Sequence, residues 1–347
     1  MNRANQSRTI LLIAPLSHGL YGDSLMRAFQ GFGYRVTAIN SRCYMPKALS
    51  FSSRVIRKLM SRVNLARFNH AVITGACRMK PDFIVVMKGV NLVPSSLRTI
   101  RQKMPGSTLI NINYDDYLSA SPGNKFPHLN QMIPCYDYFF PSKKINVEEL
   151  LELGARNVEY IPLGYDPAIH YPVSIASEEA RIYRAEVSFI GTHTRARARL
   201  LSTITDYNLS IWGDLWTMKH INPKLTRAAT NRVVLGQEFS KVVGSSRISL
   251  NFFREGNRDT HNFKTFELPA CGGFVISERS DELGDFFEEG KEVVAFEGVQ
   301  ELKDKIDYYL RHDEARKKIV RAAYRRVQSE KYTIRDRVES ILDLMKN

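Results

Sequence analysis

The residues best suited to chemistry lie in one short stretch, His261–Ser277, where an acid and a base share a helix face. The pattern predicts a short helix entered from a polar loop, two glycines that end it, and then a buried strand. Lys264 stands three residues before Glu267, which puts both side chains on the same face. Open α/β sheets bind ligands at the carboxyl ends of their strands, where this helix should begin. We therefore expect Lys264, Glu267 and Gly272 to bind a phosphorylated or sugar-like ligand.

The polar loop that leads into this helix, within Asn251–Glu267, holds a further candidate. Asp259 lies eight residues before Glu267, so the two carboxylates could bind two different hydroxyl pairs of a nucleotide sugar. The alternative is that Asp259 only caps the junction between loop and helix. For Glu267 we favour a functional role, because a carboxylate among apolar and small residues is costly to desolvate without a polar partner.

A second polar loop, Gly191–Arg199, joins a predicted strand to a predicted helix. Gly191, Thr192 and a helix start that carries arginines suit the binding of a diphosphate. On a helix, Arg195 and Arg199 share a face, while Arg197 points elsewhere. We therefore take Arg195 and Arg199 as the candidates for the ligand and expect one or two of the three arginines to be plain solvated charge.

The first half of the chain offers a glycine-containing loop, Ser17–Asp23, after its first predicted strand. The glycines permit a close backbone approach, and the next helix offers its N-terminus to an anion. The spacing is not that of a dinucleotide-binding fingerprint, and a turn that only packs the helix explains the glycines equally well. His18 in this loop is a candidate base, although a lone histidine is more often structural.

Two adjacent carboxylates, Asp115 and Asp116, directly follow another predicted strand. At the carboxyl end of a strand, such a group can orient or deprotonate a hydroxyl. Neighbouring side chains alternate in direction, so at most one should reach a substrate. In the alternative interpretation both cap the next turn.

Absent motifs narrow the chemistry. The sequence has no DxD, no HExxH, no GxSxG and no Walker A loop, which disfavours a metal centre, serine hydrolysis and P-loop phosphoryl transfer. Its four cysteines are scattered, as expected for a reducing cytoplasm. It lacks the run of about 18 apolar residues that a membrane span needs, and Ile10–Ala14 is too short for a signal-peptide core. We expect a cytoplasmic protein that needs no cofactor.

Strands and helices alternate along the 347 residues, which predicts an α/β protein with parallel sheets. The prolines and glycine of Pro162–Ala180 interrupt this alternation and indicate a hinge. We expect two Rossmann-like doubly wound domains, residues 1–165 and 166–330, that face each other across a cleft. Residues 331–347 should form a final helix. The predicted strands are Thr9–Ala14, Arg35–Asn40, Asp82–Lys88, Thr108–Asn113, Asp137–Phe140, Asn157–Ile161, Glu186–Ile190, Leu209–Gly213, Arg247–Asn251, Phe274–Ser277 and Glu292–Phe296.

Several of these segments together resemble the CgeB-like glycosyltransferases, a family of the spore-maturation-protein type with the GT-B fold. The most specific pattern is an aromatic residue and an acid, small residues, two glycines and an apolar strand. The matching segments are Asn262–Ser277, Asp281–Phe296, Leu163–Pro172, Phe189–Thr192 and Tyr332–Arg337.

The resemblance implies transfer of a sugar from a nucleotide-sugar donor on the C-terminal domain to an acceptor on the N-terminal domain. By analogy Glu267 binds the donor ribose, and Lys264 lies near the diphosphate. Asp259 stands where many related enzymes have a glutamate near the donor sugar. GT-B enzymes generally need no metal, and their final helix returns to the first domain. The acceptor would be a cell-surface glycan or a lipid-linked molecule. A nucleotide-sugar epimerase of GT-B fold and a non-catalytic envelope or coat assembly protein remain alternatives.

Positive charge is concentrated at the start of the chain. Residues 1–80 contain 13 lysines and arginines but one acid, Asp23, in a chain of net charge +14. Within them, Ser53–Phe68 predicts an amphipathic basic helix suited to the anionic inner face of the cell membrane. An ordinary helix packed on the sheet is the alternative, and no module indicates nucleic acid. The residues expected to contact the membrane are Arg54, Arg57, Lys58 and Arg62.

Overall fold

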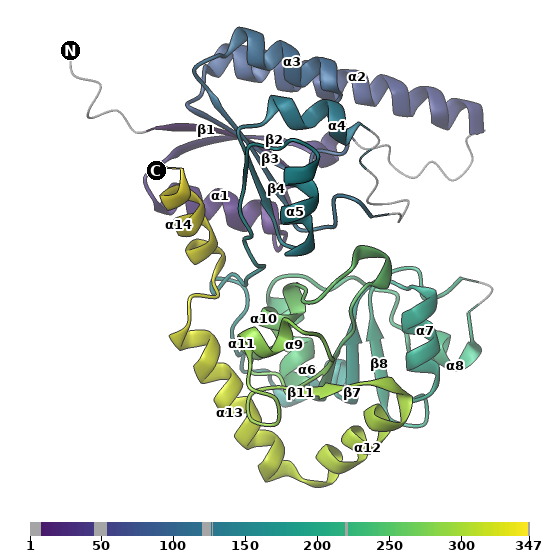
Figure 1. Cartoon of the computed structure of the whole chain (residues 1–347). Helices are drawn as coiled ribbons and strands as arrows, with labels where there is room; N and C mark the ends of the chain where they lie inside the picture. Colours follow the sequence, from purple (N-terminus) through teal and green to yellow (C-terminus); the bar gives the residue numbers. More distant parts are fainter. Residues whose placement is uncertain (1–7, 45–53, 120–125, 127, 219–220, 346–347) are drawn as a thin grey trace. The chain divides into compact units, whose positions relative to one another are not determined.

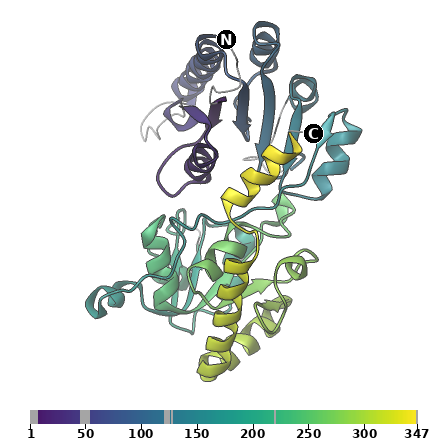
Figure 2. The ribbon, with the colours of Figure 1, turned by 90° about the vertical axis from the view of Figure 1, so that its left-hand side faces the viewer.

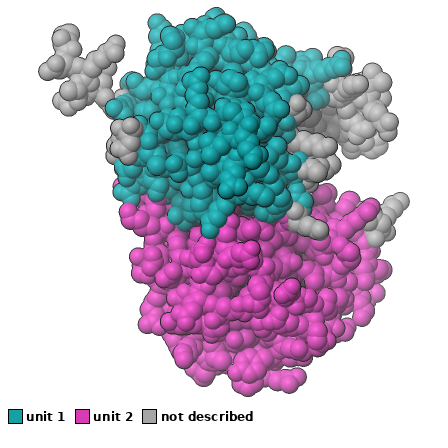
Figure 3. Space-filling view, in the orientation of Figure 1, with its two compact units in different colours: residues 1–162, 255–258, 337–347 teal, residues 163–254, 259–336 magenta. Residues whose placement is uncertain are grey.

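The computed structural model describes residues 8–44, 54–119, 126, 128–218 and 221–345, without the side chains of residues 54–59, 177 and 255. The chain divides into two compact units (Figures 1 and 3). Unit 1 comprises Met1–Pro162, Glu255–Arg258 and Arg337–Asn347, and unit 2 comprises Leu163–Arg254 and Asp259–Asp336. The expected boundary thus shifts by a few residues, and Glu255–Arg258 belongs to unit 1 instead of the predicted second domain.

Unit 1 is built on a six-stranded sheet, counted over the described residues, in the order β2-β1-β3-β4-β5-β6. All neighbouring strands pair in parallel. Runs such as Ile10–Ala14 are completely apolar because helices cover both faces of such a sheet. The strands are β1 (Thr9–Ala14), β2 (Arg35–Asn40), β3 (Phe83–Met87), β4 (Thr108–Asn113), β5 (Tyr138–Pro141) and β6 (Asn157–Val158).

The helices of unit 1 lie on both faces of its sheet (Figures 1 and 2). Helices α2 and α3 pack side by side on one face, where Val72 and Leu97 join the core, and α1 lies on the other face. Right-handed crossovers require this, because the chain moves from β1 to β2 in one direction and returns past β1 to β3. The helices are α1 (Tyr21–Gly31), α2 (Arg54–Met79), α3 (Pro94–Lys103), α4 (Leu129–Met132) and α5 (Ile145–Glu152), with short 3₁₀ turns at Ser41–Tyr44 and Ile133–Cys135.

Unit 2 has, within its described residues, a five-stranded parallel sheet in the order β11-β10-β9-β7-β8. Its core joins Phe189 and Ile211 of the sheet with Leu201 and Leu302 of the helices. The strands are β7 (Ala185–Ile190), β8 (Leu209–Trp212), β9 (Ser246–Asn251), β10 (Val275–Glu278) and β11 (Val294–Phe296). The helices are α6 (Ser177–Tyr183), α7 (Arg195–Ser202), α8 (Pro223–Ala228), α9 (Gln237–Ser245), α10 (Phe263–Ala270), α11 (Leu283–Phe286), α12 (Gly298–Arg311) and α13 (Asp313–Ser329). Helix α14 (Ile334–Leu344) follows, with its residues from Arg337 onward in unit 1.

The strand order of unit 2 reverses direction between β7 and β9. From β7 the chain moves outward to β8, and from β9 it moves to the opposite edge through β10 and β11. The loops that leave the carboxyl ends of β7 and β9 therefore diverge and open a crevice, where doubly wound sheets bind ligands. Both polar loops predicted from the sequence of this half lie at this switch point.

Each predicted strand is confirmed: three have the predicted ends, and the ends of the others differ by one to three residues. Helix α2 continues to Met79 instead of ending near Phe68. Its second half is long because Phe68, Val72 and Ala76 recur at helical spacing and pack into the core. None of the helices in the described residues is long and apolar enough to cross a membrane.

Candidate functional site

The start of α10 is fixed by a buried polar network. Asn262 caps the helix by accepting a hydrogen bond from the Thr265 N–H at 3.2 Å, and the Thr265 hydroxyl accepts one from the Asn262 N–H at 3.1 Å. Below them, the fully buried Asn251 amide donates to Thr265 Oγ1 at 3.3 Å and to Ser277 Oγ at 3.2 Å. This capping box holds the first turn of α10 against the carboxyl ends of β9 and β10.

Lys264, on that first turn, is a half-buried cation without a neutralising contact. Among the described residues its ammonium group makes no hydrogen bond or ion pair. Burial lowers the pKa of Lys264, Glu267 partly opposes this, and Arg197 and Arg254 lower the pKa further. Withdrawing a charge from water without a partner is unfavourable, so this position favours an anionic ligand.

Glu267 has a polar partner that the sequence analysis missed. The Nε2 atom of His170 lies 3.6 Å from Glu267 Oε1, and His170 is buried. The other ring nitrogen of His170 accepts a hydrogen bond from the Asp166 N–H at 3.2 Å, so the proton of the neutral ring is on Nε2, facing the carboxylate. The Glu267 side chain is 16% exposed, so it is held in position while still reaching solvent.

Arg197 lies on another face of α7 than Arg195 and Arg199, as predicted, and its charge lowers the pKa of Lys264. Its guanidinium donates to the carbonyls of Thr192 at 3.1 Å and Phe252 at 3.2 Å, and lies 5.4 Å from the centre of the Phe189 ring. Burial lowers the pKa of Arg197 to about 10, and the neighbouring Arg254 contributes to the shift.

The two arginines assigned to the ligand behave differently. Arg195 and Arg199 do share a face of α7, but both are exposed. Thr194 caps α7 by accepting from the Arg197 N–H at 3.2 Å, and this cap fixes which face turns inward. The structure therefore adds Arg197 to the candidate site, and the assignment of Arg195 and Arg199 to the ligand remains a prediction.

Asp259 closes the loop that carries Arg254. Its carboxylate accepts the Arg254 N–H at 3.0 Å and lies 3.6 Å from the Arg254 Nε atom, with its side chain 3% exposed. Nearby, burial raises the pKa of Glu278 at the end of β10, although a hydrogen bond from the Phe253 N–H and the charge of Arg197 oppose the rise. Glu278 is a site residue that the sequence analysis missed.

The glycines of this half have two different positions. Gly191 lies at the carboxyl end of β7, where a Cβ atom would come within 2.9 Å of the Phe189 ring and 3.3 Å of Arg197 Nη1. Gly191 thus makes room for Arg197, and Thr192 beside it is exposed. Gly272 follows the last turn of α10, and this helix returns the chain to the amino edge of the sheet. Gly272 therefore does not share a site with Lys264 and Glu267, contrary to expectation.

In unit 1, both adjacent carboxylates are buried in ion pairs. Asp115 lies 2.5 Å from the Lys88 ammonium, and its side chain is 1% exposed. Asp116 also caps the turn, because its Oδ1 accepts the Leu118 N–H at 2.9 Å. This geometry gives no support to the prediction that either carboxylate orients an acceptor, and it agrees with the capping alternative for Asp116.

The main partner of Asp116 is Arg258, from the short segment that unit 1 receives out of the β9–α10 loop. Arg258 donates two hydrogen bonds of 2.6 Å to Asp116 and two, of 2.6 and 2.9 Å, to Glu149. Burial of the Asp116 carboxyl opposes the shift, but hydrogen bonds from Arg258 and Asn146 prevail and lower its pKa. Asp116 is therefore the anchor of this segment.

His18 is exposed in the loop after β1, and within the described residues its side chain has no hydrogen-bonding partner. Its assignment as a base remains a prediction. On α2, the side chains of Arg54, Arg57 and Lys58 lie outside the described part, whereas Arg62 is exposed. The described residues contain no group of three histidine, cysteine, aspartate or glutamate side chains arranged to hold a metal ion.

Comparison with known proteins finds a family match for part of the chain and structural matches for nearly all of it. Residues 195–343 match a protein-family model described as glycosyl transferase-like. A search of curated proteins finds no match. Among solved structures, sucrose-phosphate synthase from Thermosynechococcus elongatus aligns at 14% identity with a TM-score of 0.70, over 98% of each chain.

Two further structures share the fold. Anabaena HepE, solved in complex with UDP-glucose, is 13% identical with a TM-score of 0.67, over 97% of this chain and 99% of that one. A glycosyltransferase from Rickettsia africae is 12% identical with a TM-score of 0.65, over 98% of both chains. Residues 195–343 thus match a glycosyl transferase-like family model, and the chain has the two-unit α/β fold known as GT-B.

Proposed function

We propose that unit 2 binds a nucleotide-sugar donor through its diphosphate and that the enzyme transfers the sugar without a metal ion. The observation that carries this proposal is the ammonium of Lys264 at the switch point of the sheet, which makes no hydrogen bond or ion pair within the described residues. Arg197 and Arg254 bring two more positive charges near Lys264, although Glu267 and Asp259 oppose part of this charge. A diphosphate is the anion that such a group of cations would neutralise.

Glu267 gives the proposed site its polarity. A carboxylate cannot face the diphosphate, so it accepts hydrogen bonds from a ribose, as the resemblance to CgeB-like enzymes implies. His170 keeps the carboxylate in one orientation. When the bond between sugar and diphosphate breaks, negative charge grows on the leaving group, and preorganised cations lower the barrier. His18 in unit 1 is the remaining candidate for the group that orients the acceptor hydroxyl.

A binding experiment tests the donor site. We expect a nucleoside diphosphate to bind in calorimetric titrations, and UDP is the first to try because the Anabaena relative was solved with UDP-glucose. Lys264→Met should weaken binding about 10-fold or more, since a hydrogen bond to a charged group contributes about 1.5–3 kcal/mol. Lys318→Met, an exposed position on α13, is the matched control. Failure of every nucleoside diphosphate to bind the folded protein would exclude the proposal.

The product then distinguishes the alternatives. A transferase consumes its donor only with an acceptor present, whereas an epimerase converts the donor alone. We propose a cell-surface glycan or a lipid-linked molecule as acceptor. Glu267→Ala should abolish donor consumption in membrane extracts of the host cell. If Glu267→Ala restores the phenotype of a deletion strain as fully as the wild-type gene, the role is not catalytic.

We further propose that α2 contacts an anionic membrane surface. Val63 and the core residue Val72 are nine residues apart, about 2.5 helical turns, and so lie on opposite sides of α2. Met60 and Val63 are accordingly 41% and 50% exposed, near the exposed Arg62 and Arg67. Figure 1 shows this half of α2 extending beyond the sheet of unit 1. Each basic residue near such a surface adds about 1 kcal/mol.

Vesicle sedimentation tests this contact. Binding to phosphatidylglycerol vesicles should fall in the double variant Met60→Ser, Val63→Ser, and should weaken as salt is raised. Val299→Ser with Leu215→Ser, two exposed apolar positions in unit 2, is the control. Equal sedimentation of both double variants would contradict a role for α2.

A further inference from the structure

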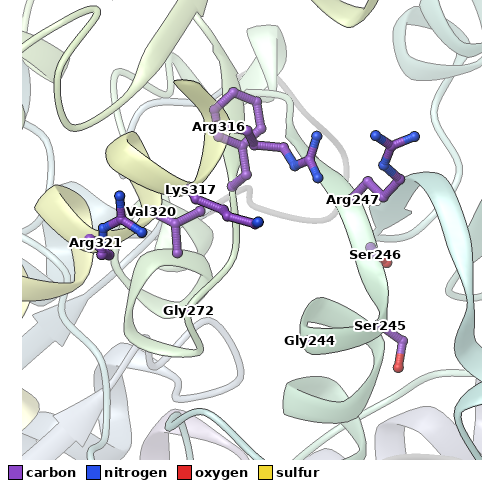
Figure 4. Close-up of a pocket in the computed structure, with 10 residues that line it drawn as sticks. Gly244, Ser245, Ser246, Arg247, Gly272, Arg316, Lys317, Val320 and Arg321 are labelled. Atoms are coloured by element: carbon purple, nitrogen blue, oxygen red, sulfur yellow. The ribbon is translucent and has the colours of Figure 1, made fainter. Parts of the chain in front are cut away.

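Unit 2 contains a cavity of about 360 Å³ that is separate from the proposed donor site. One wall is the first part of α13, with Arg316, Lys317 and Arg321, and the opposite wall is the junction of α9 and β9, with Ser245 and Arg247 (Figure 4). The volume is near the lower limit of about 300 Å³ for small-molecule pockets. A phosphorylated small molecule fits this volume better than a complete nucleotide sugar.

The cavity lies at the opposite edge of the sheet from Lys264. The residues that line it include the first two of β9, Ser246 and Arg247, and two that precede β10, Gly272 and Phe274. These positions are the amino ends of the two parallel strands. The six residues of β9 separate the two edges by roughly 17 Å at about 3.3 Å per residue. A ligand in this cavity would therefore not occupy the donor site.

Two arginines of the cavity are held in place by one carboxylate. The Asp313 Oδ1 atom lies 2.6 Å from Arg247 Nη2 and 2.8 Å from Arg316 Nη1. Each guanidinium also donates to a backbone carbonyl, Arg247 to Leu310 at 2.5 Å and Arg316 to Tyr309 at 2.7 Å. These contacts already hold the two guanidinium groups in place, so binding a ligand would cost little additional conformational entropy of the Arg247 and Arg316 side chains.

Positive charge exceeds negative charge around the cavity. Lys317 pairs with Glu314 at 2.8 Å, whereas Arg321 has no ion pair in the part of the chain that the structure describes. Four cations thus face two carboxylates, Asp313 and Glu314. The carboxyl-terminal end of α9 adds about half a negative charge, which leaves the cations in excess.

A neutral group in the wall also lacks a partner. The buried hydroxyl of Ser245 makes no hydrogen bond within the described structure. A buried hydroxyl without a partner is unfavourable, and a rotation of the Ser245 side chain would let it donate to an oxyanion, which the excess of cations attracts. We propose that this cavity is a second anion site, which binds the phosphate group of a small phosphorylated molecule.

Titration with inorganic pyrophosphate tests the second site, and a Lys264→Met background removes the proposed donor site from the measurement. We expect pyrophosphate to bind this variant, and to bind about 10-fold more weakly after Lys317→Gln and Arg321→Gln are added. The matched control adds Lys318→Gln and Arg325→Gln, two exposed positions on the same helix that do not line the cavity. The control should bind as the background does.

Three results would overturn the second site. The first is complete loss of pyrophosphate binding in Lys264→Met alone, and the second is equal affinity of the cavity and control variants. The third is a lipid source: the cavity variant sediments less with phosphatidylglycerol vesicles but binds pyrophosphate unchanged. A crystal soaked with pyrophosphate, with density between Arg321 and Ser245, would support the proposal.

Discussion

Arg197 provides the sharpest test of the site, because two otherwise similar arginines lie on the same helix. Replacing Arg197 with alanine removes two hydrogen bonds from a charged group to carbonyls, and a contact with the Phe189 ring. Such hydrogen bonds contribute about 1.5–3 kcal/mol each, and a cation–π contact contributes about 0.5–2 kcal/mol. Burying the charge offsets part of this sum, so we expect a loss of about 3 kcal/mol.

Intrinsic tryptophan fluorescence can measure the loss of stability of Arg197→Ala in unit 2. The chain has two tryptophans, Trp212 and Trp216, and both belong to unit 2. Trp216 packs against Phe189, beneath the Arg197 guanidinium, so its emission reports the unfolding of this region. Urea titrations should therefore show a lower midpoint for Arg197→Ala with a single transition.

Arg195→Ala and Arg199→Ala are the controls, because both side chains are exposed. Exposed substitutions usually change stability by about 0.5 kcal/mol or less. If either control destabilises unit 2 as much as Arg197→Ala does, the position of Arg197 described above is incorrect.

Three more predictions concern Lys264, Arg258 and Gly213. The lowered pKa of Lys264 means that binding an anion raises this pKa and takes up a proton. Affinity for a nucleoside diphosphate should therefore fall as the pH rises from the lowered pKa toward 10.5. The stability of the free protein should rise over the same pH interval, because the unfolded chain then binds more protons. Lys264→Arg should remove both trends, as measured by calorimetry in buffers of different ionisation enthalpy. Arg258→Ala should destabilise unit 1 by about 3–5 kcal/mol, because it leaves the Asp116 carboxylate buried without its cation. Hydrogen exchange in β4 and α5 should become faster. An unchanged exchange rate would contradict the role of Asp116 as the anchor of this segment. Gly213→Ala should prevent stable folding, because the added Cβ would lie 2.2 Å from the Gly191 carbonyl oxygen. Gly33→Ala, at φ +85° with nothing within 4 Å of the added Cβ, should lower the free energy of unfolding by only about 1 kcal/mol. Thermal melts followed by circular dichroism distinguish the two variants.

The sheets and their polar edges could be predicted from local patterns. Apolar runs of five or six residues mark buried parallel strands, and the residues that follow them gather at one edge because all strands run in the same direction. Lys264 and Glu267 were placed by this argument alone. The same argument explains the error at Gly272, since a residue at the far end of a crossover helix returns to the other edge.

Partners that are distant in the sequence could not be predicted in this way. His170 lies nearly a hundred residues before Glu267, and Arg258 lies more than a hundred residues after its two carboxylate partners. No periodicity connects such positions, because the contact depends on how helices and loops pack after the sheet has formed. Asp115 and Asp116 appeared as free carboxylates for the same reason, since their cations come from Lys88 and Arg258.

The inward position of Arg197 depends on helix phase, which the arginine spacing alone leaves open. The alternation of arginines at 195, 197 and 199 indicates that Arg197 lies on a different face from the other two. The helix cap and the space available beside the strand then determine which face turns inward. Thr194 fixes the cap, so Arg197 occupies the third helical position and its stem turns back toward the strand. Gly191 leaves space at that point, because a side chain there would collide with the guanidinium. An inward arginine is therefore expected where a glycine ends a strand and a capping threonine stands three residues before the arginine. Arg195 and Arg199 do not stand three residues after Thr194, so the same argument does not apply to them.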